Sequence, residues 1–109
     1  MTLAEFQAHI FLVARNSGIC TIPIVLRLTT TAIKVRVELV DGDYMDAFFN
    51  EVSGRTAFAL IDQGERIFGA DNAGGWHVHP FASPGDHLPV DAPISFAEFV
   101  AVIERHLVE

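Results

Sequence analysis

The stretch that decides the fold runs from residue 33 to residue 70 and reads IKVRVELVDGDYMDAFFNEVSGRTAFALIDQGERIFGA. Its first part alternates apolar with charged side chains at a period of two, which is typical of a strand with one buried and one exposed face. Turn-forming pairs interrupt the stretch at Asp41-Gly42, Ser53-Gly54 and Gln63-Gly64. The pattern therefore predicts an antiparallel meander of short strands.

A further strand precedes this meander. Residues 20–28 alternate in the same way, and Pro23 within them cannot donate a hydrogen bond to a neighbouring strand. We therefore expect this strand to begin at Pro23 or to lie at an edge of the sheet.

Helices are predicted at both ends of the chain. Thr2 and Glu5 form a T-x-x-E capping box, and Gly18 is suited to ending the helix that follows. Ser95 and Glu98 repeat the capping box before a second apolar stripe at helical spacing. The predicted fold class is α+β, with an antiparallel meander sheet of four to five strands flanked by an N-terminal and a C-terminal helix.

Length and composition indicate a single globular domain over residues 1–109. Half of the residues are apolar, and nine of them are Phe, so the chain can build a packed core. No run of about 18 apolar residues occurs, and no basic lead-in or cleavage site opens the sequence. The single Cys20 agrees with a reducing compartment, so we expect a cytoplasmic protein without a membrane partner.

Charge is distributed unevenly along the chain. The net charge is -7; residues 1–40 hold four basic and two acidic groups, and residues 41–109 hold three basic and twelve acidic groups. Because such a surface repels phosphate, contact with nucleic acid would need a local patch, for which Lys34 and Arg36 are the candidates and Trp76 a candidate for base stacking. The alternatives are a solvated sheet face for the basic pair and a packing role for Trp76.

Residues 71–91 interrupt the strand pattern with Gly and Pro pairs and predict a long ordered loop. Three of the five histidines lie in it, at His77, His79 and His87. If the chain around Val78 is extended, the imidazoles of His77 and His79 project to one side, about 6 to 7 Å apart.

Two chemistries suit these side chains. One imidazole could act as base and another, protonated, as acid, which suits cleavage of RNA, with Asp71 orienting a histidine. Alternatively, His77 and His79 could bind a divalent metal with Asp71 or Asp86 as third ligand, although no cofactor is otherwise predicted. The simplest interpretation is that the histidines are polar loop surface and that Asp71 forms an Asx turn.

Several short motifs together resemble the TumE-like family of small toxins encoded beside antitoxins. The matching positions are the hairpin at 62–65, the tripeptide Asp71-Asn72-Ala73, Phe81 and His87 in the loop, and the helix start at 95–98. The resemblance covers about residues 33–107. It implies an antitoxin partner and RNA as a target.

The sequence therefore predicts a toxin-like protein that acts on RNA through His77, His79 and His87, with Asp71 as the orienting residue. The alternative is a non-catalytic interaction module that binds an antitoxin or forms a homo-oligomer. Phe11 and Leu12 suggest this alternative, because they widen the apolar arc of the first helix beyond one face.

Overall fold

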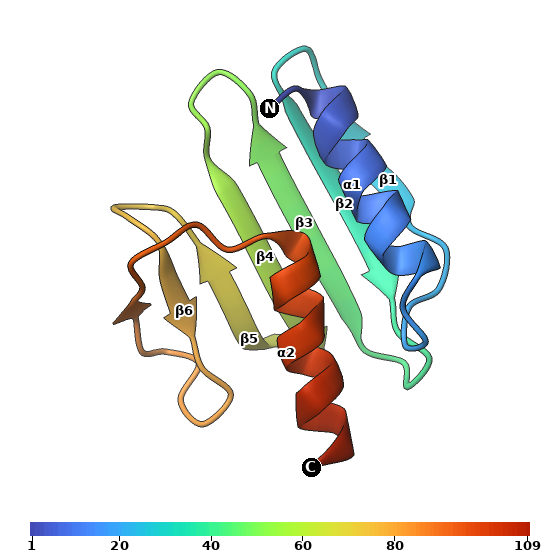
Figure 1. Cartoon of the computed structure of the whole chain (residues 1–109), viewed down its shortest axis with the longest axis vertical. Coiled ribbons are helices and arrows are strands. Elements are labelled where there is room, and N and C mark those ends of the chain that lie inside the picture. The colour runs from blue at the N-terminus through green and yellow to red at the C-terminus, as the bar shows by residue number, and fades with distance from the viewer.

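The computed structural model describes residues 1–109 and is built on one antiparallel sheet of seven strands, arranged in chain order (Figure 1). The strands are β1 (Ile24–Leu28), β2 (Ala32–Glu38), β3 (Tyr44–Asn50), β4 (Thr56–Asp62), β5 (Glu65–Asp71), β6 (His77–His79) and β7 (Leu88–Pro89). The predicted α+β meander is confirmed, with β1 at an edge as Pro23 suggested. The strand count is corrected from four or five to seven.

The two additional strands lie in the segment predicted as a loop, residues 71–91. Strand β6 contains three residues and β7 contains two, and each pairs antiparallel with the strand before it. Such short strands carry too few positions to show a period of two, and the surrounding Gly and Pro residues hide them.

Both capping boxes are confirmed. Helix α1 (Leu3–Arg15) begins at the Thr2 cap, and helix α2 (Phe96–Val108) begins at the Ser95 cap. In each box the cap hydroxyl accepts a backbone N–H while a glutamate accepts the N–H of the cap residue. Neither helix is long and apolar enough to cross a membrane.

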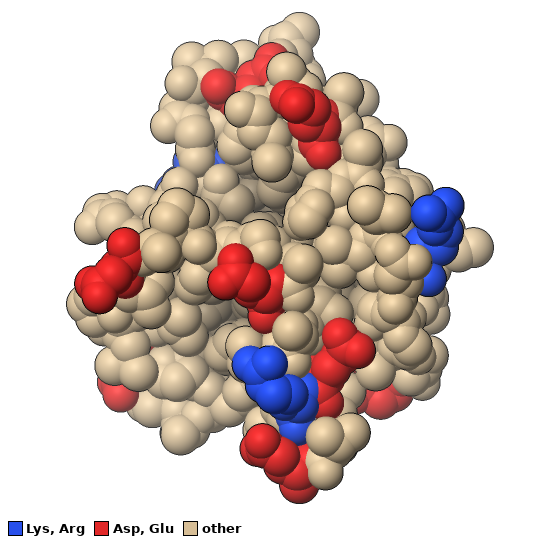
Figure 2. All heavy atoms as spheres, in the orientation of Figure 1, with Lys and Arg blue, Asp and Glu red and all other residues tan.

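The two helices lie over the same face of the sheet (Figure 1), and the core fills the space between them and the strands. Alternate side chains of β2 to β5 point into this core, including Val35, Met45, Phe58 and Phe68. The surface around the helices carries scattered acidic groups and few basic ones (Figure 2). Because side chains alternate along a strand, the residues of β2 to β5 that do not point into the core lie on the opposite face of the sheet.

Two carboxylates meet at one end of the β3–β4 pair. Tyr44 pairs with Ile61, so Asp43 lies opposite Asp62 in the neighbouring position. Burial, a hydrogen bond shared with Asp62, and the charges of Asp41 and Asp62 raise the pKa of Asp43 to about 6. Like charges directly opposite one another weaken a strand pair.

This contact predicts a pH effect on stability. Since the pKa of Asp43 is raised in the folded state above its ordinary 3.8, its stabilising effect is complete below pH 3.8 and is lost as the pH rises through about 6. Asp43→Asn is therefore expected to raise the free energy of unfolding at pH 7.5 and to flatten its pH dependence between 5 and 7.5. Urea unfolding of wild type and variant at both pH values measures this difference. Parallel pH profiles of the two proteins would contradict it.

Candidate functional site

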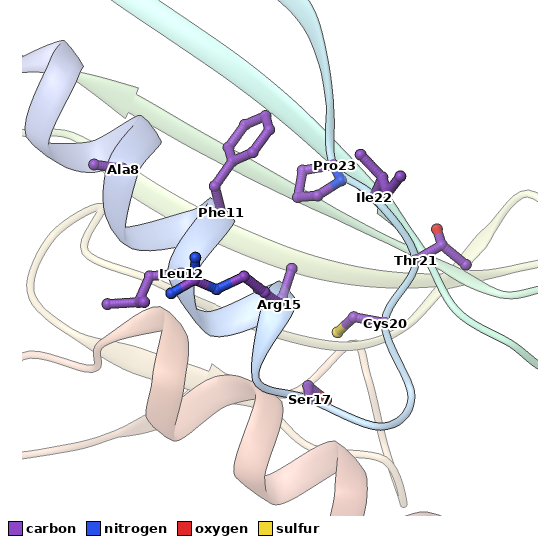
Figure 3. Close-up of a pocket in the computed structure, with 10 residues that line it drawn as sticks. Ala8, Phe11, Leu12, Arg15, Ser17, Cys20, Thr21, Ile22 and Pro23 are labelled. Carbon is purple, nitrogen blue, oxygen red and sulfur yellow. The ribbon is translucent and has the colours of Figure 1, made fainter.

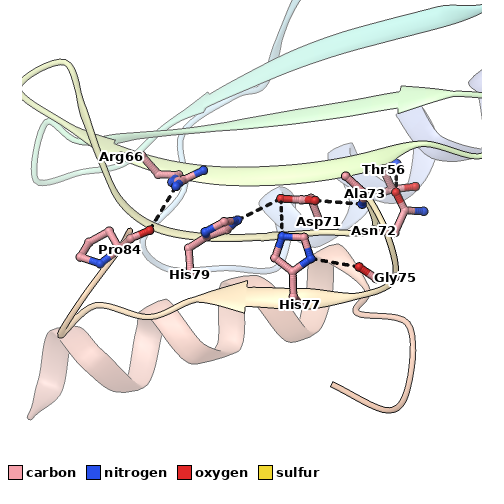
Figure 4. Close-up of polar contacts among 9 residues, drawn as sticks. All are labelled: Thr56, Arg66, Asp71, Asn72, Ala73, Gly75, His77, His79 and Pro84. Carbon is pink, nitrogen blue, oxygen red and sulfur yellow. Dashed lines mark hydrogen bonds and ion pairs between the residues drawn. The ribbon is translucent and has the colours of Figure 1, made fainter. Parts of the chain in front are cut away.

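The candidate site is built on the β5–β6 hairpin (Figure 4). At the end of β5, Oδ1 of Asp71 accepts the N–H of Ala73 at 2.9 Å, so the Asx turn suggested by the sequence is present. Gly74 and Gly75 follow with φ of 71° and 107°, a left-handed conformation that glycine adopts without strain. The turn reverses the chain, so that His77 pairs with Asp71 across the two strands.

Asn72 fixes the same end of β5 to the rest of the sheet. Its side-chain oxygen accepts the N–H of Thr56 at 2.9 Å, and its amide nitrogen donates to the carbonyl of Gly54 at 2.9 Å. The turn that carries the site is thus attached to the start of β4 as well as to β5.

The three loop histidines converge. His77 and His79 lie on the same side of β6, as its extended backbone requires. Strand β7 pairs Leu88 with Val78, which brings His87 opposite His79 on that side. The ring centroids are 4.8 Å apart for His77 and His79, 4.9 Å for His77 and His87, and 4.5 Å for His79 and His87. One nitrogen from each ring lies within 4.8 Å of the other two.

The histidines differ in exposure. His77 and His79 are 8% and 2% exposed, whereas His87 is exposed to solvent. The cluster is therefore enclosed from the sheet side and opens to solvent at His87. Asp71 and Asp86, the alternative third ligands from the sequence, both lie outside this group.

Asp71 is the anionic partner of the cluster. Its Oδ2 lies 3.0 Å from Nε2 of His79 and 3.3 Å from Nε2 of His77. Burial acts to raise the pKa of Asp71, but the N–H of Ala73, the hydrogen bond to His79 and the charges of the two rings outweigh it. The pKa lies below its ordinary value, so Asp71 is ionised at neutral pH.

Two ring nitrogens of the cluster lack a suitable hydrogen-bond partner, Nε2 of His77 and Nδ1 of His79. Nδ1 of His77 lies 3.0 Å from the carbonyl of Gly75, which only accepts, so this nitrogen carries a proton. Nε2 of His77 then faces the Asp71 carboxylate, and a proton or another cation must separate the two acceptors. His79 donates through Nε2 to Asp71, which leaves its buried Nδ1 without a partner. Nε2 of His77 thus faces an anion with its lone pair, and the buried lone pair of His79 Nδ1 has no hydrogen-bond donor.

Gly69 makes room for the His79 ring, a role that the strand pattern did not reveal. It pairs with His79 across β5 and β6. A Cβ at Gly69 would lie 3.1 Å from Cδ of Arg66, 3.3 Å from the carbonyl oxygen of Phe58 and 3.4 Å from Cδ2 of His79. Glycine inside a strand often marks such a close approach, and this was the only available signal in the sequence.

An aromatic stack holds the loop that carries His87. The Phe81 ring lies between Phe68 of β5 and His106 of α2, with centroid distances of 4.4 Å and 3.6 Å. The loop between β6 and β7 is therefore anchored to the core and to the C-terminal helix. This anchor explains how an exposed loop can position a histidine.

The two basic residues proposed for nucleic-acid contact lie apart from the cluster, whereas Trp76 directly precedes His77. Lys34 and Arg36 belong to β2, three strands before β5, and both are paired with Asp46, at 3.6 Å and 2.8 Å. Trp76 packs beside Phe58, with the ring centroids 6.5 Å apart. The structure therefore shows Trp76 in a packing contact and the two basic side chains paired with Asp46, which the sequence did not predict, and nucleic-acid contact by the three residues stays a prediction.

The resemblance to the TumE-like toxins also stays a prediction. Comparison of the chain with protein-family models, with curated proteins and with solved structures gives no match.

Proposed function

We propose that His77, His79 and His87, supported by Asp71, form a divalent metal centre of the zinc type that activates a water molecule for hydrolysis. The observation that carries this proposal is the convergence of three imidazole nitrogens within 4.8 Å of one another, two of the rings being buried. Ligands at about 2.0 to 2.1 Å from zinc lie about 3.3 Å apart in a tetrahedron, so a small contraction of the cluster would bring all three into range.

The proton count supports the same conclusion. Because Nδ1 of His77 donates to Gly75, its Nε2 is free to bind a cation in front of the Asp71 carboxylate. A cation there lies beside Nε2 of His79 as well, which binds it when the ring proton of His79 is on Nδ1. A carboxylate or backbone carbonyl that holds the far nitrogen of a ligating histidine is the usual arrangement at such centres.

Three protein ligands leave a fourth position for water, and a bound zinc ion lowers the pKa of that water to about 7. His87 contributes the exposed side of the site, so solvent and substrate reach the open position there. His77 and His79 set the geometry from the enclosed side.

The test is a titration with Co²⁺, a spectroscopic substitute for zinc. Wild type is expected to bind one ion per chain with the visible absorption of a four-coordinate site. His87→Ala, which removes the exposed ligand, is expected to weaken binding by about 10- to 100-fold or more, because removal of a mere supporting partner already costs that much. His9→Gln on α1 is the matched control and should bind as wild type does. Absence of Co²⁺ binding, or equal weakening in the control, would reject the metal centre.

The acid–base cleavage of RNA expected from the sequence uses the same histidines, and metal removal separates the two ideas. A metal-dependent centre predicts that RNA incubated with chelator-treated protein stays intact and that added Zn²⁺ restores any cleavage. Equal cleavage with and without chelator would favour the metal-free mechanism instead.

A second candidate function is self-association through β1. This strand is an edge of the sheet, and three of its four apolar side chains are exposed, including Leu28 at 61% and Ile24 at 50%. Beside it, Phe11 and Leu12 of α1 line a groove of about 710 Å³ that is drawn in Figure 3. Antiparallel pairing of two copies about Leu26 would set Ile24 against Leu28 of the second copy, apolar against apolar.

Mass measurement by light scattering tests this pairing. Wild type is expected to be a dimer at micromolar concentration, and Leu26→Lys is expected to be a monomer that still unfolds cooperatively, at a midpoint that no longer depends on protein concentration. A wild-type mass equal to that of one chain would reject the dimer.

A further inference from the structure

We infer that the proposed metal centre binds a phosphate group and that Arg66 contacts its oxygen atoms. The inference rests on the proposed function and names the class of ligand that the same site takes. Three features support it: the position of Arg66 beside His79, its charge without an ion-pair partner, and the fourth coordination position of the proposed metal ion.

Arg66 lies directly beside the cluster. Its Cδ and the Cδ2 of His79 both lie within 3.4 Å of the point that a Cβ of Gly69 would occupy. The arginine side chain therefore crosses the backbone at Gly69 next to the His79 ring; Arg66 and His79 are drawn in Figure 4. Since Gly69 carries no side chain, the His79 ring and the Arg66 side chain both lie against its backbone.

The charge of Arg66 is not used within the chain. Nη2 donates to the carbonyl of Pro84 at 3.1 Å, and no carboxylate lies within ion-pair distance of Arg66. Arg36, by contrast, makes two hydrogen bonds to Asp46. The side chain of Arg66 is exposed, so most of its five N–H donors face solvent.

The contact with Pro84 also orients the guanidinium. Pro84 lies in the loop that carries His87, so this loop positions both the third histidine and the arginine. A guanidinium that donates only one hydrogen bond within the protein keeps other N–H groups for a bidentate contact with an oxyanion.

Charge and shape together select phosphate. A divalent ion and Arg66 outweigh the one carboxylate of Asp71, so the site is locally cationic in a chain of net charge -7. A tetrahedral phosphate has enough oxygens to occupy the open metal position and to accept two N–H groups of Arg66 at the same time. A planar carboxylate has only two oxygens to divide between them.

The experiment titrates inorganic phosphate into the Co²⁺-loaded protein and follows the visible spectrum and the heat of binding. Arg66→Gln is expected to bind Co²⁺ as wild type does but to bind phosphate about 10- to 100-fold more weakly, since hydrogen bonds to charged groups are lost. Arg55→Gln, in the turn before β4, is the control and should bind both as wild type does. Acetate is expected to bind more weakly than phosphate to wild type.

The possible results separate the two proposals. If no Co²⁺ binds, the metal centre and the phosphate site are both rejected. If Co²⁺ binds and Arg66→Gln binds phosphate as tightly as wild type does, only the phosphate site is rejected. Parallel titrations with a phosphate monoester and with a dinucleotide diester show whether the phosphate is recognised free, as a monoester or within a nucleic-acid chain.

Discussion

His79→Ala is expected to lower the Co²⁺ and Zn²⁺ affinity of the protein by more than about 100-fold, a larger loss than removal of a supporting partner causes. His79 is the most enclosed member of the cluster, at 2% exposed, and it alone combines a hydrogen bond to Asp71 with an unpaired buried nitrogen. Its removal deletes a ligand and frees the carboxylate that orients it. Competition with a coloured chelator measures the affinity.

Because the His79 ring is buried, its loss could also loosen the fold, and a second variant separates these effects. Gly69→Ala keeps every ligand but adds a Cβ 3.4 Å from Cδ2 of His79 and 3.3 Å from the carbonyl oxygen of Phe58. The contact with the backbone oxygen is the tight one, so β5 must shift by a few tenths of an ångström against β4, which displaces the backbone that lies against the His79 ring. We expect a smaller loss of affinity than in His79→Ala, with a cooperative unfolding transition retained. Wild-type affinity in His79→Ala would contradict the assignment of this ligand.

Phe99→Ala is expected to lower the free energy of unfolding by about 3 to 5 kcal/mol. The ring is 1% exposed, and it packs against Phe58 at 5.5 Å and Phe68 at 5.1 Å between centroids. The truncation leaves a cavity between α2 and the sheet, bounded by neighbouring strands that cannot close it fully. Urea unfolding monitored by circular dichroism measures the loss.

The same helix supplies the control for this measurement. Val108 is 84% exposed at the end of α2, so Val108→Ala should change the free energy of unfolding by no more than about 0.5 kcal/mol.

Phe68 also packs against Phe81, so a cavity at Phe99 is expected to loosen the loop that carries His87. An unfolding free energy within 1 kcal/mol of wild type for Phe99→Ala would show that α2 contributes little to the core.

The helices and the central strands could be predicted because their signals are local. A capping box brings together residues three positions apart, and a half-buried strand shows its period within one segment, as Thr2 with Glu5 and residues 33–39 illustrate. The spacing of His77 and His79 likewise required one face for both rings once the segment was extended. Asp71 was a candidate because a turn residue with a carboxylate preceded them.

The remaining features depend on which strands become neighbours, and no local pattern specifies that. The pairing of β7 with β6 places His87 opposite His79, and the pairing of β5 with β6 places the bare backbone of Gly69 under the ring. Arg66 lies beside His79 because its side chain crosses that backbone. Residue types and periods therefore determined the helices, the strands up to β5 and the side on which His77 and His79 project. Hydrogen bonding between separate segments, at a distance set by strand spacing, formed β6 and β7 and brought the cluster together.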